Sequence, residues 1–115
     1  SGKGFKVWFI EFVNEKALQE FENLPNDIKA RMAHIIKLLE VYGNTLGKPH
    51  TASLGEGFFE IRAKSSEGIA RSVYCYQIGK KILILATAIK KQNKLPTSVM
   101  EIAKNRLKEF ENGNN

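Results

Sequence analysis

The chain alternates apolar and polar side chains with two different periods, which divide it into predicted strands and helices. Period two, with many β-branched and aromatic residues, predicts strands, whereas apolar residues three and four apart predict helices. Short glycine-bearing turns between the last three strands favour consecutive antiparallel hairpins. The predicted strands are Lys6 to Phe12, Phe58 to Ala63, Ile69 to Ile78 and Lys81 to Ile89.

Two helices are predicted between the first and second of these strands. Asn14 is a residue type that caps helix N-termini, and the apolar stripe after it runs to Leu24-Pro25, where proline ends the helix. A longer stripe follows over Ile28 to Tyr42, and Gly43 suits the C-terminus of that helix. A tight turn between the two helices predicts an antiparallel helical hairpin.

A last helix is predicted near the C-terminus, where Ser98-x-x-Glu101 forms a capping box and the apolar stripe reaches Phe110. The stretch from Gly43 to Gly57, with four glycines and one proline, is predicted to be a loop. The expected fold is α+β in the order β-α-α-β-β-β-α, an antiparallel sheet with the helical hairpin on one face. We expect one domain over residues 1–115, with residues 1–4 partly derived from an expression tag.

Strand alternation also sorts side chains between the two faces of the sheet. Ile61 points one way, whereas Glu60 and Arg62 point the other, and Arg71 shares a face with apolar neighbours on its own strand. Because the helical hairpin covers one face, the other is predicted to be partly open and to carry the arginines. Glu60 is placed to pair with Arg71 across the hairpin.

The composition is that of an ordinary globular domain, with 43% hydrophobic and 26% charged residues. No apolar run approaches the ~18 residues that span a membrane, so no membrane association is expected. A single cysteine, Cys75, cannot form an internal disulfide, which favours the reducing cytoplasm. Trp8 and Phe9 are expected in the core, because aromatic residues contribute strongly to it.

The net charge of +6 is concentrated in the second half of the chain. Residues 61–115 contain 11 Lys or Arg against 4 Asp or Glu, whereas residues 1–60 contain 7 against 8. A basic half on a small domain indicates a polyanionic partner such as RNA. A generally basic, solvated surface is the alternative interpretation.

The candidate chemistry rests on cations. One cysteine and two separated histidines, His34 and His50, make no metal site, so no metal or cofactor is expected, and His34 falls on the exposed side of its helix. Fixed cations can stabilise the negative charge that builds on a phosphoryl group when a ribose 2′-hydroxyl attacks it. The candidate cations are Arg62, Arg71, Lys90 and Lys91, with Lys94 close by.

Three motifs follow one another in this basic half. They are Phe58-Phe59-Glu60-Ile61-Arg62, then Ala70-Arg71-Ser72-Val73-Tyr74, then Ile89-Lys90-Lys91 with Leu95-Pro96 and Glu101-Ile102-Ala103. Their order and spacing resemble the RelE superfamily of bacterial toxins, in its HigB or host-killer branch. The predicted element order agrees with that family, and the resemblance covers the chain from about Lys6 to Phe110.

The resemblance implies the toxin of a type II toxin–antitoxin system, a metal-independent endoribonuclease that cuts translated mRNA on the ribosome. Its implied partner is a cognate antitoxin of the helix-turn-helix, HigA-like kind. Carried over by position, the basic residues of the family's active face are Arg62, Arg71, Lys90 and Lys91.

Three further points bear on the site. Ala86 and Ala88 stand where many HigB-like members carry a His and a Phe, which leaves His50 as the histidine placed to assist proton transfer. The additional candidates for RNA binding are Lys48, Lys94, Tyr74 and Phe110, although Tyr74 and Phe110 are also explained by packing. Two alternatives stay open: a ParE-like toxin that inhibits DNA gyrase, and a non-catalytic RNA-binding module.

Overall fold

A five-stranded sheet organises residues 5–90 and 95–113, which are the part of the chain that the computed structural model describes. The strands are β1 (Phe9–Phe12), β2 (Thr51–Gly55), β3 (Phe58–Ser65), β4 (Gly68–Gln77) and β5 (Lys81–Lys90). The helices are α1 (Glu15–Glu22), α2 (Asn26–Tyr42) and α3 (Thr97–Gly113), and a short 3-10 turn, η1 (Gly43–Thr45), follows α2. The α+β class predicted from the sequence is confirmed.

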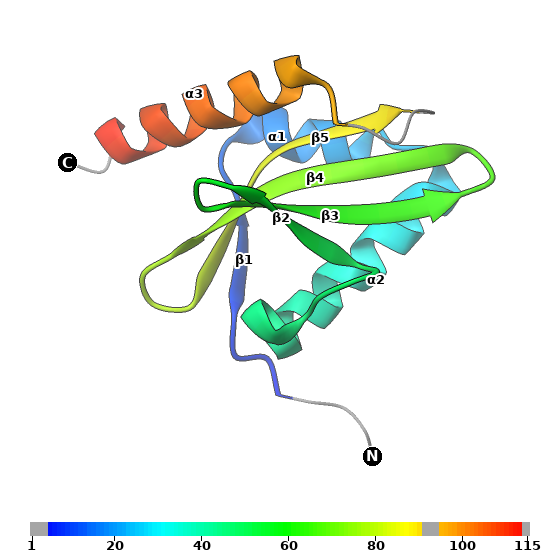
Figure 1. Ribbon diagram of the computed structural model, residues 1–115, viewed down its shortest axis with the longest axis horizontal. Helices are drawn as coiled ribbons and strands as arrows, with labels where there is room; N and C mark the ends of the chain where they lie inside the picture. The colour runs from blue at the N-terminus through cyan, green and yellow to red at the C-terminus, as the bar shows by residue number, and fades with distance from the viewer. Residues whose placement is uncertain (1–4, 91–94, 114–115) are drawn as a thin grey trace.

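The strand order across the sheet is β1-β5-β4-β3-β2. Strands β2 to β5 pair antiparallel as a meander, of which the part from β3 to β5 was predicted from the glycine-bearing turns. Figure 1 shows α2 behind the sheet and α3 on the near side, above the sheet in that view, so helices lie on both faces. Part of the near face, toward the β3–β4 turn, is left without a covering helix (Figure 1).

Each face of the sheet carries its own apolar cluster. The first cluster joins α2 to β3, β4 and β5, and its fully buried side chains include Ile28, Met32, Ile35, Leu39, Ile61, Tyr74, Ile82 and Ile84. The second cluster lies under α3 and includes Phe58, Val73, Cys75, Leu83, Leu85, Ala86, Val99 and Ala103. Successive strand residues alternate between the two clusters, as period-two patterning requires.

The predicted helix ends are confirmed at two positions. The Asn14 side chain accepts a hydrogen bond of 2.9 Å from the Ala17 backbone N–H, which caps α1. Gly43 ends α2 with φ of +50°, a backbone conformation that favours glycine. A Cβ at Gly43 would overlap the Trp8 indole, so the same glycine lets the first cluster close against α2. Within the described residues, no helix has the length and apolarity needed to cross a membrane.

The prediction that Gly43 to Gly57 is a loop is wrong in part, because this stretch contains η1 and the strand β2. This strand, Thr51–Gly55, is a short edge strand whose only large apolar residue is Leu54, so it lacks a long alternating apolar signal of its own. Its hydrogen-bonded ladder with β3 makes it a strand.

The first strand also differs from the expectation in three ways. It begins at Phe9 rather than Lys6, and it pairs parallel with β5, so the sheet is mixed rather than wholly antiparallel. Phe9 is 70% exposed because β1 is the outer strand of the sheet, whereas Trp8 packs against the first cluster as predicted.

Candidate nucleic-acid interface

Arg62 lies at the point on β3 where pairing with β2 ends. β2 pairs with β3 as far as Thr51 opposite Ile61, and the next backbone N–H, that of Arg62, donates to the His50 carbonyl at 2.8 Å. Beyond this bond β3 has a free edge among the described strands. The Arg62 side chain is exposed, so its guanidinium is available to a ligand.

Next to this free edge lies a pocket of about 340 Å³ with a strongly cationic wall. Arg62 and Lys64 line it from β3, His50 from the preceding loop, and Arg31 from α2. The remaining lining residues are Ile35, Pro49 and Ile69, so none of the described residues that line it is acidic. We call it the cationic pocket.

The loop that carries His50 is fixed by backbone hydrogen bonds. The N–H groups of His50 and Thr51 both donate to the Gly47 carbonyl, at 3.0 and 3.1 Å, and the Thr51 hydroxyl donates to the Leu46 carbonyl at 3.0 Å. These bonds hold the half-buried His50 beside Arg62 and leave its imidazole at the pocket wall. His34 is exposed on α2, as predicted.

Arg71 is buried, whereas a residue that binds phosphate on an open face is expected to be exposed. Its side chain is 3% exposed, and its Nη1 donates to both carboxylate oxygens of Glu60, at 2.9 and 3.1 Å. The predicted Glu60–Arg71 pair is therefore confirmed. The placement of Arg71 among the exposed cations is corrected, because the pair buries the guanidinium and compensates its charge.

The strand register brings Lys90 into line with the cationic pocket. Lys64, Ile69 and Lys90 form one row across β3, β4 and β5, so the backbones of the two lysines lie about 10 Å apart. In the next row, Arg62 and Arg71 are opposite one another, and Ala88 follows on β5. The predicted site residues Lys91 and Lys94 lie outside the described residues.

Ala86 and Ala88, the two alanines singled out in the sequence, have different surroundings. Ala86 is buried in the second cluster under α3, whereas Ala88 is half-buried and packs at the margin of that cluster. The methyl side chain of Ala88, opposite Arg71 on β5, cannot transfer a proton. His50 therefore supplies the imidazole nearest to Arg62 among the described residues that line the pocket.

The three remaining RNA-binding candidates that the structure describes are dispersed. Lys48 is exposed, one residue before Pro49 in the loop beside the cationic pocket. Tyr74 is 1% exposed and belongs to the first cluster, so its proposed stacking on a base is corrected: no ring face is open to solvent. Phe110 packs against the second cluster from α3, and this contact occupies its ring.

Arg31 and Lys64 were not predicted as site residues, although the position of each in the sequence carries a signal. Lys64 follows Arg62 by two residues and therefore shares its strand face. Arg31 lies three residues after Ile28 and four before Ile35, so it is a cation on the edge of an apolar helical stripe. Neither pattern shows that α2 packs beside the free edge of β3.

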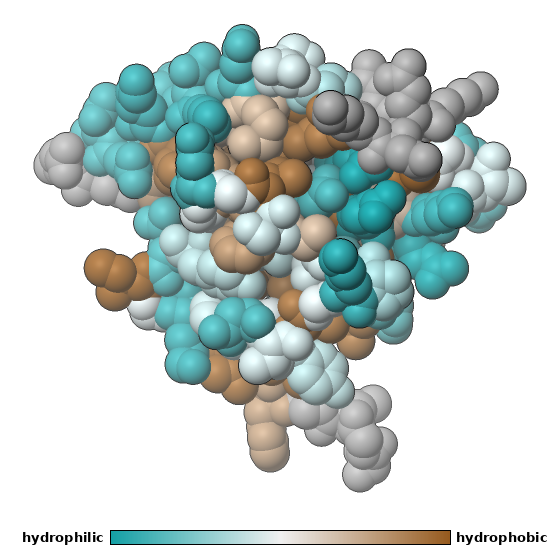
Figure 2. Space-filling view, in the orientation of Figure 1, coloured by the Kyte–Doolittle hydropathy of each residue, from teal (hydrophilic) through white to brown (hydrophobic). Residues whose placement is uncertain are grey.

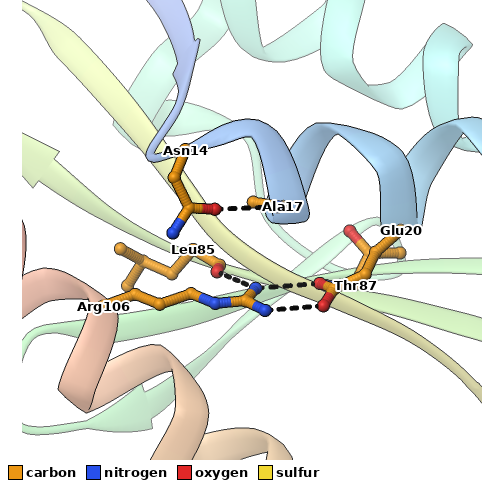
Figure 3. Close-up of polar contacts among 6 residues, drawn as sticks. All are labelled: Asn14, Ala17, Glu20, Leu85, Thr87 and Arg106. Carbon is orange, nitrogen blue, oxygen red and sulfur yellow. Dashed lines mark hydrogen bonds and ion pairs between the residues drawn. The ribbon is translucent and has the colours of Figure 1, made fainter.

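A polar network fixes α3 over the second cluster. Arg106 donates to both oxygens of Glu20 on α1, at 3.0 and 2.7 Å, and to the Leu85 carbonyl at 2.9 Å (Figure 3). The Thr87 backbone N–H donates to the same Glu20 carboxylate at 3.0 Å. The network joins α1, α3 and β5 at one point and sets how much of the sheet α3 covers.

The uncovered part of the sheet is hydrophilic. Figure 2 shows strongly hydrophilic side chains over the part of β3 and β4 nearest their connecting turn, whereas apolar side chains lie between α3 and the sheet. The exposed residues of that part of β3 are Arg62 and Lys64. The arrangement can bind an anion through several cations and place an imidazole beside it.

Two solved structures share this fold. A chain of the toxin–antitoxin complex RelBE2 from Mycobacterium tuberculosis is 21% identical, with a TM-score of 0.53 over 74% of this chain and 93% of that one. A chain of the archaeal RelE–RelB complex from Pyrococcus horikoshii OT3 is 16% identical, with a TM-score of 0.54 over 76% of this chain and 99% of that one. At these identities the likeness shows the fold.

No curated protein sequence matches the chain with comparable significance. The sequence model of the family described as phage derived protein Gp49-like (DUF891) matches residues 19–108, a span that includes α2, the whole β2–β5 meander and most of α3. Because this match covers well over half of its length, the chain belongs to the Gp49-like family.

Proposed function

We propose that this chain is the toxin of a type II toxin–antitoxin system and cleaves translated mRNA in a ribosome-dependent manner. The observation that carries the proposal is the cationic pocket, where Arg31, Arg62 and Lys64 meet His50 at the free edge of β3. The fold supports it, since the two solved structures described above are of RelB–RelE toxin–antitoxin complexes. On the basis of the three sequence motifs, we further propose that the toxin is of the HigB or host-killer branch.

The proposed reaction is attack of a ribose 2′-hydroxyl on the adjacent phosphorus. The P–O bond to the 2′ oxygen forms while the bond to the 5′ oxygen of the next nucleotide breaks, leaving a cyclic phosphate and a free 5′-hydroxyl. Arg62 binds the phosphoryl oxygens through two parallel N–H groups, and Lys64 and Arg31 add positive charge. The charge that develops in the transition state is thereby stabilised.

Proton transfer in this proposal falls to His50. A neutral imidazole can take the 2′ proton, and an imidazolium can return one to the leaving 5′ oxygen. His50 lines the same pocket as Arg62, and the Arg62 N–H to His50 carbonyl bond fixes the spacing of their backbones. The mechanism uses side chains alone and needs no metal or cofactor. The backbone register places Lys90 one row along the sheet from Arg62, and Lys90 and Lys91 are proposed to act with it.

The proposed partner that restrains the toxin is a helix-turn-helix, HigA-like antitoxin in the cytoplasm. A basic face around Arg62 and Lys64 is neutralised most directly by a partner that presents acidic or apolar segments. Co-expression of the chain with the product of the adjacent gene, followed by affinity purification, tests this pairing. A stable complex and restored growth are expected, whereas an adjacent product that forms no complex contradicts the pairing.

The activity itself is tested by inducing the chain in bacteria and mapping RNA ends by primer extension. We expect growth arrest and cuts at in-frame positions of translated messages. The matched control is the same message without its start codon, which should remain intact. DNA breaks that depend on gyrase, with intact messages, would instead establish the ParE-like alternative, and RNA binding without any cleavage would establish a non-catalytic module.

A further inference from the structure

A second hollow of about 350 Å³ lies on the other side of the loop that carries His50. Its lining is aromatic and polar rather than strongly charged. The residues that define it here are Lys48, Thr51, Ser53, Phe59, Tyr74 and Tyr76. We call it the aromatic pocket, and the reaction proposed above assigns it no role.

The wall of the aromatic pocket is a rigid set of rings. The centroid of Phe59 lies 5.6 Å from that of Tyr74 in a stacked arrangement and 5.0 Å from that of Tyr76 edge to face. Trp8 supports Tyr76 from behind at 5.4 Å. Phe59 and Tyr76 are each half-buried, so part of both rings faces the hollow, whereas Tyr74 closes its base.

Polar groups are also available at this wall. Burial raises the pKa values of Tyr74 and Tyr76, so both hydroxyl groups keep their protons at neutral pH, and the half-buried Tyr76 can donate a hydrogen bond to a ligand. The exposed Ser53 adds a second hydroxyl group from the β2 side of the hollow. A planar ligand with acceptors at its edge matches these donors.

The loop Gly47–His50 is common to both hollows. Gly47 and Lys48 line the aromatic pocket, and Pro49 and His50 line the cationic pocket. Lys48 and His50 are two residues apart, so their Cα atoms are separated by about 7 Å at most. This separation is comparable to the length of one nucleotide, so a single strand that crosses the loop can place a phosphate on one side and a base on the other.

Resting on the function proposed above, we infer that the aromatic pocket binds a nucleobase of single-stranded RNA whose neighbouring phosphate occupies the cationic pocket. Charge complementarity favours this occupant, because Lys48 at the aromatic pocket and Arg31, Arg62 and Lys64 next to it all attract a polyanion. Stacking on Phe59 and Tyr76 supplies the apolar part of the interaction and tolerates any base.

The test measures the binding of two short single-stranded RNAs by fluorescence anisotropy, one with all its bases and one abasic throughout. Ser53→Phe fills the aromatic pocket from an exposed position on β2 and leaves the cationic pocket untouched. Gln19→Phe, which adds the same ring on the exposed side of α1, is the matched control. Circular dichroism and thermal melting of each variant verify that it folds.

The wild type should bind the abasic RNA roughly 5- to 150-fold more weakly than the complete RNA, the range that corresponds to stacking of one base. Ser53→Phe should remove most of this difference by weakening only the complete RNA, whereas Arg31→Ala should weaken both RNAs equally. Gln19→Phe should behave as the wild type does.

Equal affinity of the wild type for the two RNAs overturns the inference, as does a Ser53→Phe protein that still distinguishes them. Loss of antitoxin binding in Ser53→Phe with unchanged RNA binding would assign the pocket to the protein partner and also overturn it. Failure of this inference and failure of the proposed function give different results. Base-dependent binding without cleavage of translated mRNA refutes the proposed function alone, and cleavage that Ser53→Phe leaves unchanged, with base-independent binding, refutes this inference alone.

Discussion

The Arg71 guanidinium reaches diagonally across the β3–β4 hairpin to Glu60, with Nη1 2.9 Å from one carboxylate oxygen and 3.1 Å from the other. Both side chains are buried, at 3% and 9% exposure. Arg62, directly opposite Arg71 on β3, is exposed. Two arginines on one face of one hairpin therefore have different surroundings: Arg71 is paired with Glu60 inside the protein, and Arg62 is open to solvent.

Removal of the carboxylate from this pair should destabilise the fold strongly. Glu60→Ala leaves a buried guanidinium whose charge has lost its compensating carboxylate, which typically costs about 3–5 kcal/mol in the free energy of unfolding. Urea denaturation followed by circular dichroism measures the change. Glu67→Ala, in the exposed turn of the same hairpin, is the matched control and should change stability by less than about 0.5 kcal/mol. Equal loss in both variants would mean that the pair adds nothing specific.

Loss of the exposed arginine should abolish toxicity without unfolding the protein. Arg62→Ala removes a fixed donor to the phosphoryl oxygens, and loss of one such donor typically reduces the rate ~10²- to 10³-fold. Arg62→Lys should not rescue, because an ammonium cannot reproduce the two parallel hydrogen bonds of a guanidinium. The measurements are growth after induction and primer extension at equal expression. A fully toxic Arg62→Ala protein would show that the cationic pocket is not the active site.

The control for this experiment is Lys108→Ala. Lys108 is an exposed cation on α3, outside the cationic pocket, so its loss changes the net charge equally and should leave toxicity intact. Lys104 is less suitable, because its Nζ lies 3.0 Å from Glu56 and over the ring of Phe58. Lys90→Ala should reduce toxicity as Arg62→Ala does, since the strand register places the Lys90 backbone in the same row as Lys64.

Replacement of His50 tests the proton-transfer step separately from phosphate binding. His50→Ala should reduce cleavage less than Arg62→Ala does, because the cations that stabilise the transition state remain. It should leave the affinity for single-stranded RNA nearly unchanged, because Arg31, Arg62 and Lys64 still bind the phosphate. His34→Ala, on the exposed side of α2, is the matched control. An unchanged cleavage rate in His50→Ala would remove His50 from the mechanism.

The attachment of α3 should depend on one side chain. Arg106 joins Glu20 on α1 to the Leu85 carbonyl on β5, so Arg106→Ala removes three hydrogen bonds and leaves the Glu20 carboxylate without its cation. Hydrogen exchange followed by mass spectrometry should show faster exchange over Thr97–Gly113 than in the wild type, with little change in β3 and β4. Lys108→Ala again serves as the control. Uniform acceleration over the whole chain would indicate global destabilisation instead.

The sequence by itself determined the strands β3, β4 and β5, the three helices and the two faces of β3 and β4. These features follow from local rules: side chains alternate along a strand, Asn14 caps α1, and Gly43 accepts the backbone conformation that ends α2. The Glu60–Arg71 pair was also predicted from the sequence, because the predicted hairpin places the two residues near one another across the two strands. The HigB-like branch, the ribosomal target and the antitoxin remain predictions.

Only the tertiary structure decided which cations form a site. Burial of Arg71 but not Arg62 depends on Glu60 and on where β2 stops, and β2 is a short edge strand with one large apolar residue that gains its order from pairing with β3. The meeting of Arg31 with His50 and Arg62 depends on α2 packing beside the free edge of β3. These are contacts between segments far apart in the chain, and local periodicity carries no information about which segments pack together.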